Sequence, residues 1–307
     1  MPRHQKLVKV PLNRGLYKAL LFFLFLGLFL ICLPGQAQEE EEEEFKGVGI
    51  HLKLRGARIS FLGGDIEKGT AGLYDRQVAE IASAGFELGA NGKRPFRIGY
   101  EMTGDIIYHF TPRIGIGVGG SLVRAHQESS LLFHWPGSLY EYRLMSLPEI
   151  KIFSIRLGLF YAIPLDRLLT ICLSAGPEYH FAAYKYGGNL TTPYSASSLT
   201  HRAEARQLGI QGGLGLEIRM NQRLAFIIEV FGRYAKISGF EGKEETYEWS
   251  GGHSSTVEDN GIILFIEGEQ YPRLDIPSAG EPGGQGAREA VFDLSGVSLQ
   301  AGLNFKF

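Results

Sequence analysis

Two pairs of side chains in this chain have the types and spacing that nucleophilic chemistry needs. His253 and Ser255 stand two residues apart, and so do Glu178 and His180. A histidine can take the proton of a neighbouring hydroxyl, and a carboxylate can orient that histidine. His253, however, follows a Gly-Gly pair that favours a loop, whereas Glu178 and His180 alternate with apolar residues as in a β-strand. For the second pair, polar residues that pair on one strand face are the simpler interpretation.

Two further motifs could indicate ligand binding. Residues 115–120 match the G-x-G-x-x-G pattern of dinucleotide sites, but these glycines lie within an alternating strand pattern, and that fingerprint needs a helix after them. Glu258-Asp-Asn-Gly261 is acidic enough for calcium, yet it lacks the alternating ligand spacing of a calcium loop. We interpret the first as a glycine-lined strand and the second as an Asn-Gly turn. No cofactor, metal ligand or catalytic residue is predicted.

The N-terminus has the features of a secretory signal peptide. Basic residues precede an apolar run at residues 19–33, and Gly35 and Ala37 provide a small-x-small cleavage site. We predict a signal peptide at residues 1–37, an acidic periplasmic spacer at 38–44 and one domain at 45–307. An uncleaved anchor is the alternative, although a spanning helix needs about 20 apolar residues.

Charge and cysteine content exclude other classes of protein. Residues 1–37 hold five of the 31 basic residues and none of the 33 acidic ones, so cleavage leaves a net charge of −7. An acidic protein lacks the electrostatic footprint of a nucleic-acid-binding protein, and we predict no nucleic-acid partner. Only Cys172 remains after cleavage, so no intrachain disulfide is expected.

Period-two alternation of apolar and polar residues dominates the rest of the chain and predicts β-strands. It is clearest at the C-terminus, where one face comprises Val297, Leu299, Ala301, Leu303, Phe305 and Phe307. Similar stretches are residues 48–61, 96–110, 114–122, 150–163, 169–181, 208–218 and 224–234. The parity slips at Gly56, which predicts a β-bulge. Residues 150–163 alternate less well, because Ile152 and Phe160 fall on the polar face.

The connections between these stretches alternate in length. Short turns fall at residues 111–113, 164–167 and 221–223, and long connections at 63–94, 124–146, 186–206 and 239–289. Short turns at one rim and long loops at the other are typical of transmembrane barrels. The sequence therefore predicts an all-β fold: a closed antiparallel up-and-down transmembrane β-barrel of about eight strands, with short periplasmic turns and long extracellular loops.

Two long connections carry patterns of their own. Tyr74, Val78 and Ile81 fall at i, i+4 and i+7, which predicts a short helix. Residues 239–289 combine aromatic and apolar residues with a Pro/Gly-rich segment, which predicts a hairpin extended beyond the membrane and a connector. Because exposed loops on a rigid scaffold carry recognition, we also expect this connection to be the place for an extracellular partner.

Charge placement decides which strand face meets lipid. The apolar faces of six stretches contain no charged residue, as expected where a Lys or Arg at the midplane costs about 2–4 kcal/mol. The polar faces hold both signs, and we predict that they pair into a polar plug in the lumen because an unpaired buried charge is costly. This network is predicted to comprise Arg97, Glu101, Asp105, Glu178, Glu229 and Arg233. Further lumen charges are expected at Lys53, Arg55, Arg156, Glu217, Arg219 and Lys306.

Aromatic residues near the strand ends predict the two interfacial girdles of a membrane barrel. At the turn rim they are Tyr108, Phe110, Tyr161, Phe305 and Phe307. At the loop rim they are Phe96, Phe181 and Tyr234.

With a last strand ending in Leu303, Phe305 and Phe307, the chain resembles the bacterial outer-membrane β-barrels. Over residues 45–307 its architecture is similar to the eight-stranded OmpA-, OmpX- and OmpW-like barrels. The resemblance implies a location in the cell outer membrane and contact with outer-membrane lipid. It also implies that the barrel assembly machinery recognises the C-terminal strand through Leu303, Phe305 and Phe307.

The leading hypothesis is a non-catalytic protein with a structural or surface-interaction role through its long extracellular loops. One alternative, implied by the OmpW-like architecture, is a narrow channel for small hydrophobic solutes. Another is a lipid-modifying outer-membrane enzyme, since some eight-stranded barrels remove acyl chains with a histidine and a serine two residues apart on a strand face. His253 and Ser255 have that spacing but lie in a predicted loop.

Overall fold

The computed structural model describes residues 48–138, 140–192, 195–267, 270–277 and 286–307. All of these residues belong to one compact unit, residues 46–307. The predicted signal peptide, its cleavage after Ala37 and the acidic spacer lie outside the described residues and stay predictions.

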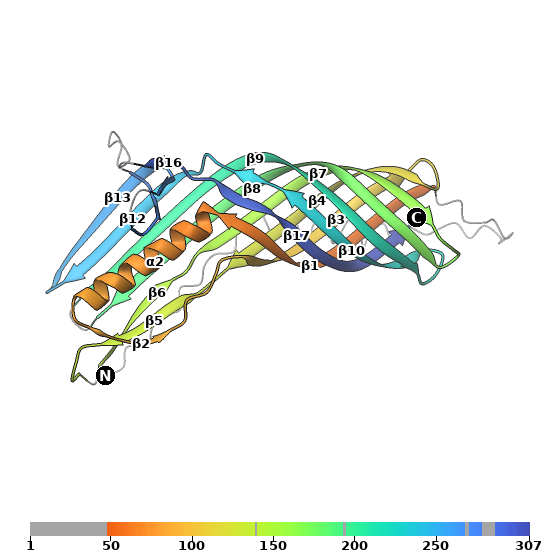
Figure 1. Ribbon diagram of the computed structural model, residues 1–307. Helices are drawn as coiled ribbons and strands as arrows, with labels where there is room; N and C mark the ends of the chain where they lie inside the picture. Colours follow the sequence, from red (N-terminus) through yellow and green to blue (C-terminus); the bar gives the residue numbers. More distant parts are fainter. Residues whose placement is uncertain (1–47, 139, 193–194, 268–269, 278–285) are drawn as a thin grey trace. The chain divides into compact units, whose positions relative to one another are not determined.

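Eight antiparallel strands close into a barrel, with each strand hydrogen-bonded to the next along the ring (Figure 1). In ring order they are β1 (Gly49–Gly64), β3 (Ile98–His109), β4 (Ile114–His126), β7 (Glu149–Pro164), β8 (Leu169–Thr191), β9 (Ser195–Arg219), β10 (Leu224–Tyr234) and β17 (Phe292–Lys306). Pairing of β17 with β1 closes the ring. The cores of all eight predicted stretches lie in these strands, so the predicted closed antiparallel barrel is confirmed.

Three tight turns join barrel strands at one end of the barrel, the turn end. In each, the residue after one strand donates its backbone N–H to the first residue of the next strand, as Phe110 does to Ile114 at 3.2 Å. Asp166 and Asn221 cap two of these turns, because each carboxyl or amide oxygen accepts two backbone N–H groups at 2.7–2.9 Å. The turns predicted at 111–113, 164–167 and 221–223 are therefore confirmed.

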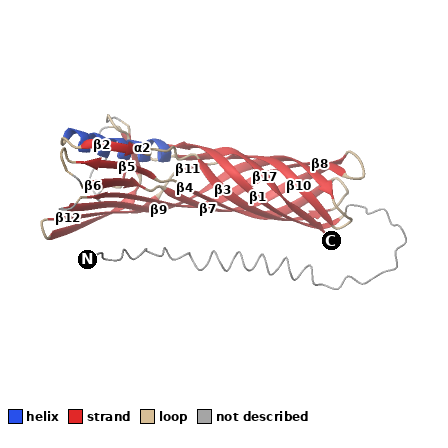
Figure 2. Ribbon diagram, turned by 90° about the horizontal axis from the view of Figure 1, so that it is seen from below, coloured by secondary structure: helices blue, strands red, loops and turns tan. Residues whose placement is uncertain are grey.

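At the opposite end, the loop end, β8 and β9 continue far past the barrel and pair with each other up to Thr191 and Ala196. Further strands extend this pair on both sides: β12 (Glu241–Ser250) and β13 (His253–Ile262) beside β9, and β6 (Glu141–Ser146), β5 (Ser129–His134) and β2 (Glu87–Asn91) beside β8. We call these strands, with the ends of β8 and β9, the outer sheet (Figure 2). The prediction of a loop at residues 186–206 is therefore wrong, because most of that segment is strand.

One helix and a small sheet pack against the outer sheet, and together they form the cap. The helix is α2 (Asp65–Ser83), and the small sheet has the order β15 (Arg273–Asp275), β14 (Leu264–Ile266), β16 (Ala287–Glu289). Gly69 and Gly72 let the helix backbone approach Pro272 and Leu274 so closely that a methyl group at either glycine would overlap them. No helix in the described part of the chain is both long and apolar enough to cross a membrane.

The helix predicted from Tyr74, Val78 and Ile81 is confirmed, and it is longer than expected because the cap supports it. Tyr74 and Ile81 are buried against Leu131, Phe133 and Leu144 of the outer sheet. This packing provides the stability that a short isolated helix lacks in water. A two-residue strand, β11 (Lys236–Ile237), pairs with β17 at the junction of barrel and cap.

Two local predictions are wrong. Gly56 is not a bulge, because β1 stays in continuous register from His51 to Phe61, and the irregularity falls between Phe61 and Gly63. The parity slip arises because Ile59 and Phe61 point inward into an apolar core. The second error is the turn at Asn260-Gly261, which lies within β13.

The hairpin predicted in residues 239–289 is confirmed as the β12–β13 pair. It turns at Gly251 and Gly252, whose φ angles of 59° and 88° suit glycine.

Candidate functional site

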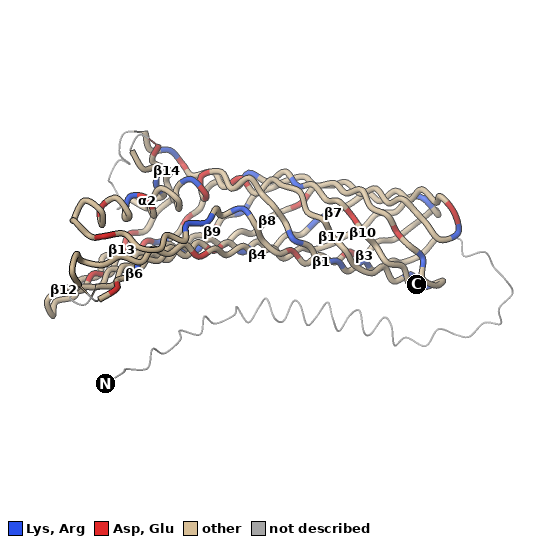
Figure 3. Tube along the Cα trace, turned by 60° about the horizontal axis from the view of Figure 1, so that its bottom comes forward, with Lys and Arg blue, Asp and Glu red and all other residues tan. Residues whose placement is uncertain are grey.

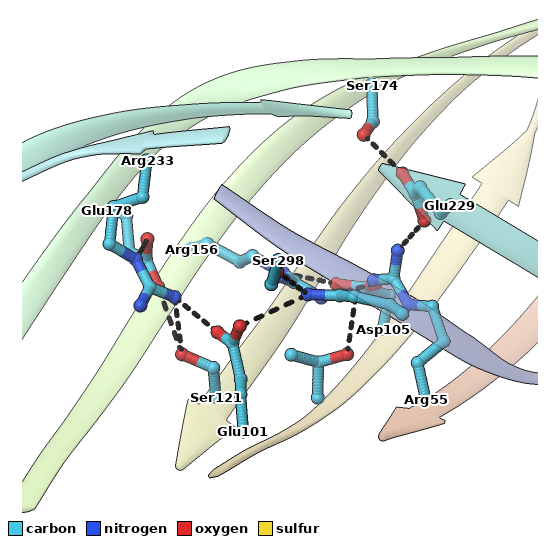
Figure 4. A network of polar contacts seen from close by, with 12 residues as sticks. Arg55, Glu101, Asp105, Ser121, Arg156, Ser174, Glu178, Glu229, Arg233 and Ser298 are labelled. Carbon is cyan, nitrogen blue, oxygen red and sulfur yellow. Dashed lines mark hydrogen bonds and ion pairs between the residues drawn. The ribbon is translucent and has the colours of Figure 1, made fainter. Parts of the chain in front are cut away.

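Buried ion pairs occupy the middle of the barrel interior (Figure 4). Arg55 on β1 pairs with both Asp105 on β3 and Glu229 on β10. Arg156 on β7 reaches the same Asp105 through two hydrogen bonds of 2.6 Å. Ser174 on β8 donates to Glu229 at 3.1 Å. Two guanidinium groups thus share one carboxylate, and the contacts cross the lumen instead of following one strand pair.

A second cluster lies nearer the loop end and is centred on Arg233 of β10. This guanidinium contacts Glu178 of β8 at 3.0 Å and Glu101 of β3 at 2.5 Å. Ser121 of β4 donates to Glu178 at 3.1 Å, and the amide of Gln300 on β17 donates to Glu101 at 3.3 Å. Groups from β3, β4, β8, β10 and β17 therefore meet around one arginine.

A third polar layer lies at the turn end. Lys306 of β17 pairs with Glu217 of β9, which also accepts a hydrogen bond from Asn304 at 2.8 Å. His51 of β1 contacts the same Asn304, and its ring centroid lies 4.3 Å from that of His109 on β3.

Opposite charges balance inside the barrel, and charged residues of both signs follow its strands (Figure 3). The buried charged side chains of the described barrel interior are Lys53, Arg55, Arg156, Arg233 and Lys306 against Glu101, Asp105, Glu178, Glu217 and Glu229. An isolated buried charge costs several kcal/mol, and close partners with further hydrogen bonds offset that penalty. The network is therefore favourable only when each charge keeps its partners.

Glycines on the inward strand faces make room for these side chains. A methyl group on Gly119 of β4 would overlap the Asp105 carboxylate, and one on Gly213 of β9 would overlap the Glu229 carboxylate. The interpretation of residues 115–120 as a glycine-lined strand is confirmed, since they lie in β4 with β7 pairing alongside.

Towards the loop end the interior changes from ionic to apolar. Ile59 and Phe61 of β1 belong to one buried core with aromatic residues from β8, β17 and the cap. Phe292 is central to this core, because its ring centroid lies 5.0 Å from Tyr184 and 4.2 Å from Phe240. Burial raises the pKa of the Tyr184 hydroxyl well above its ordinary value, so this residue stays neutral. The apolar core thus closes the barrel above the ion pairs.

Five of the six residues predicted for the lumen network lie in the two ionic clusters described above. The exception is Arg97, whose placement in the lumen is wrong. It precedes the first residue of β3, its side chain is 59% exposed, and it binds Glu67 of α2 at 2.7 and 2.8 Å. The barrel interior beside Arg97 is apolar, because the neighbouring Phe96 belongs to the apolar core. The Arg97 guanidinium therefore points outwards and contacts α2. Sequence patterns did not single out Gln300 or Ser121, since neutral polar residues on a strand face carry no pairing signal.

The residues considered for nucleophilic chemistry lie in two separate places. His180 accepts or donates a 2.8 Å hydrogen bond with Ser154 inside the barrel, and the neighbouring Glu178 is bound to Arg233. His253 and Ser255 lie exposed on β13. Among the described residues, no group of three His, Cys, Asp or Glu side chains is placed to hold a metal ion. Cys172 is buried, with its Sγ 3.9 Å from a Glu217 oxygen.

The predicted aromatic girdles are present in part. Tyr108, Phe110 and Tyr161 are exposed near the turn end, and Tyr234 is exposed towards the loop end. Phe96 does not belong to a girdle: it is buried against Phe61, with ring centroids 5.7 Å apart.

The C-terminal residues lie on the outer barrel surface beside β1 and β10. Leu303 pairs with Leu54 and Phe226, and Phe305 pairs with Leu52 and Leu224. Phe307 donates its backbone N–H to the Ile50 carbonyl at 2.9 Å. Recognition of this strand by the barrel assembly machinery stays a prediction.

No protein-family model matches the sequence, and neither does any curated protein. Solved structures do match. OprG from Pseudomonas aeruginosa, an outer membrane protein, is 13% identical with a TM-score of 0.37 over 85% of this chain and 97% of that chain. A major outer membrane protein from Thermus thermophilus is 13% identical with a TM-score of 0.35 over 84% of this chain and 99% of that chain.

The outer membrane protease OmpT from Escherichia coli matches with 9% identity and a TM-score of 0.27 over 89% of this chain and 100% of that chain. Scores this low do not fix the arrangement of this chain, which is established by its own strand pairing. By that pairing, the chain has the eight-stranded antiparallel architecture of the outer-membrane β-barrels.

Proposed function

We propose that the chain is an exported outer-membrane protein that crosses the membrane through its barrel and catalyses no reaction. In this proposal the turn end faces the periplasm, and the outer sheet and cap face the outside of the cell. The barrel serves as an anchor, and the part at the loop end carries a structural or surface-interaction role.

The observation that carries this proposal is the filled barrel interior. The side chains of Arg156, Glu101, Glu178 and Arg233 are at most 2% exposed, so water scarcely reaches this level of the lumen. The apolar core around Phe292 follows immediately above. An ion-conducting lumen needs a continuous hydrated path. The buried ion pairs and the apolar core leave no room for such a path, which supports a closed lumen.

The loop end supports the second half of the proposal. A barrel hairpin needs only a short turn, as the four-residue connections between barrel strands at the turn end demonstrate. The opposite end instead holds the outer sheet and the cap, which enclose an apolar core of their own. Such an ordered structure on a rigid barrel is suited to present a surface.

Planar-bilayer recording of the folded protein tests the closed lumen. We expect no discrete conductance steps in 1 M KCl, whereas a porin inserted in the same way provides the positive control. Heat-modifiable gel mobility verifies that the barrel is folded before recording. Regular conductance steps from the unmodified protein would contradict the proposal.

Two assays separate the alternative functions. Cells that overproduce the protein should take up a small hydrophobic fluorophore no faster than cells without it; faster uptake would favour a channel for hydrophobic solutes. Mass spectrometry of their lipid A should reveal no change in acylation, and a modified species would favour a lipid-modifying enzyme instead.

A further inference from the structure

A pocket of about 360 Å³ lies at the loop end between α2 and the outer sheet. Helix residues Glu67, Thr70, Ala71 and Tyr74 line one side of it. Opposite them lies the segment Lys93–Phe96, and the remaining lining residues are Ser129, Ser146 and Pro148. This volume falls within the range of about 300–1,000 Å³ that is usual for small-molecule sites.

Hydrogen bonds hold the Lys93–Phe96 segment in place. Its Arg94 backbone N–H donates to Ser129 Oγ at 3.1 Å, and the preceding Gly92 N–H donates to the Ser130 carbonyl at 2.8 Å. On the helix side, the Tyr74 hydroxyl donates to Asn91 Oδ1 at 2.8 Å. The walls are therefore positioned before any ligand arrives, which reduces the entropy lost on binding.

The charged side chains around the pocket differ in whether they have a partner. Glu67 forms an ion pair with Arg97, with Oε1 2.7 Å from Nε. Lys93 forms one with Asp75, with Nζ 2.6 Å from Oδ2. In the described part of the chain, the Arg94 guanidinium forms no ion pair or side-chain hydrogen bond. An arginine fork without a partner favours a carboxylate or phosphate, which it can bind through two parallel hydrogen bonds.

We propose that this pocket binds a sugar-sized anion, a hydroxylated ring that carries a carboxylate or a phosphate. Arg94 binds the anionic group, while Lys93 beside it stays paired with Asp75. The hydroxyls of Thr70 and Tyr74 donate to Ile66 and Asn91, so their oxygens can accept hydrogen bonds from hydroxyls of the ring. Phe96, Pro95 and Pro148 supply the apolar surface on which a ring packs.

This proposal deepens the surface-interaction role. It rests on one part of the proposed function, namely that the loop end faces the outside of the cell. Pro148 stands only three residues before Lys151, where the outward face of β7 has already turned polar. The pocket therefore lies near the level of lipid headgroups. The same anionic saccharide chemistry can come from a phosphorylated lipid headgroup or from a soluble acidic sugar.

Isothermal titration calorimetry of the folded protein in detergent, free of lipopolysaccharide, tests the site. Glucose 6-phosphate and glucuronate are the probes, and neutral glucose is the reference. We expect at least one anion to bind and glucose to bind at least about tenfold more weakly, because neutral glucose cannot form a charge-assisted hydrogen bond with the Arg94 guanidinium.

Matched variants tie the binding to the pocket. Arg94→Gln should raise the Kd about tenfold or more. Arg143→Gln removes the same charge from an exposed arginine on β6 that pairs with Glu128 outside the pocket, and it should leave the Kd unchanged. Ala71→Leu narrows the pocket and should also weaken binding. Absence of binding by both anions, or an equal loss with Arg143→Gln, overturns the proposal.

A second titration identifies the source of the ligand. In nanodiscs that contain lipopolysaccharide, loss of glucose 6-phosphate binding relative to phosphatidylcholine nanodiscs supports the lipid headgroup as the occupant. Retained binding supports a soluble sugar. Because calorimetry does not depend on conductance, failure of this site and failure of the closed-lumen proposal give different results.

Discussion

In the barrel the outward strand face is apolar and the inward face is polar. In the outer sheet this arrangement is reversed, although β8 and β9 run through both parts. On β9, Leu208, Ile210 and Leu214 point outwards from the barrel, whereas Gln211 and Glu217 are buried inside. Further along the same strand the outward residues are Arg202, Glu204 and Arg206, and the buried ones are His201, Ala203 and Ala205. The strand parity does not change; the chemistry of its two faces does.

This inversion shows which solvent each part of the strand meets. An apolar outer face suits acyl chains and a charged outer face suits water. On β9 the outward face changes from apolar to charged between Leu208 and Arg206; we call this point the crossing. From Leu208 to Ile218 there are ten residue steps, and at about 3.3 Å each with a tilt of about 40° they span about 25 Å, the height of a barrel's apolar band.

Other strands cross at corresponding places on their outward faces. Going from the barrel towards the loop end, the crossings fall at Gly56–Arg58, Leu122–Arg124, Phe153–Lys151 and Tyr234–Lys236. Agreement among separate strands indicates one common boundary around the barrel. The ionic interior and the apolar core meet near the same boundary, so each part has the interior that its exterior requires.

The largest effect is expected from breaking the ionic interior. Arg233→Met should lower the free energy of unfolding by about 3–5 kcal/mol, because it leaves Glu101 and Glu178 buried without their partner. Denaturant titration in detergent micelles, followed by heat-modifiable gel mobility, measures this loss.

The matched control is Arg124→Met on β4. Arg124 is 60% exposed in its pair with Glu149, so its loss should cost less than about 1 kcal/mol. Equal losses for the two variants would mean that the lumen charges do not act as a buried network.

The next effect tests the outer face on one strand. Leu214→Arg places a charge near the middle of the apolar band and should cost about 2–4 kcal/mol. Glu204→Arg places the same residue on the same face of β9 beyond the crossing and should change stability by less than about 0.5 kcal/mol. Unfolding titrations in phospholipid vesicles measure both. Similar values for the two sites would refute the assignment of the band.

Much of the barrel could be predicted from sequence because period-two alternation depends only on local spacing. The alternation fails as a guide where the environment of both faces changes at once. Ile152 and Ile59 are apolar residues at positions of the polar face; both keep the inward direction of that face and enter the apolar core. For the same reason the pattern predicts a loop at residues 186–206: Tyr186 is buried and Arg202 is exposed, the reverse of the barrel's apolar-outward pattern.

The network was predictable in membership but not in pairing. Glu101, Asp105 and Glu178 could be assigned to the lumen by face alone. The individual ion pairs could not be predicted. Arg55 and Glu229, for example, lie 174 residues apart in the sequence and meet only when the ring closes. Arg97 was assigned by the same face rule, and the rule failed there because it ends where β3 begins.

The smallest effect concerns the attachment of the cap to the outer sheet and depends on pH. Asp275 of β15 is half-buried, and burial, then the nearby Glu244 of β12, raises its pKa, while Arg273 and His201 act in the opposite direction. A raised pKa in the folded state means that the protonated form favours folding. This contribution is present below the ordinary value of 3.8 and is lost as pH rises through the raised pKa.

Asp275→Asn should therefore strengthen the cap at pH 7 by less than about 1 kcal/mol, because the group is partly solvated. Hydrogen exchange of β14 and β15, with variant and unmodified protein compared at equal pH, should reveal slower exchange in the variant at pH 7 and no difference at acid pH. Glu258→Gln removes a carboxylate from exposed β13, away from β14 and β15, and should leave the exchange of these two strands at pH 7 unchanged. If Asp275→Asn accelerated exchange at pH 7, the charged carboxylate would be stabilising the cap, and the apolar interior would tolerate a charge at its edge.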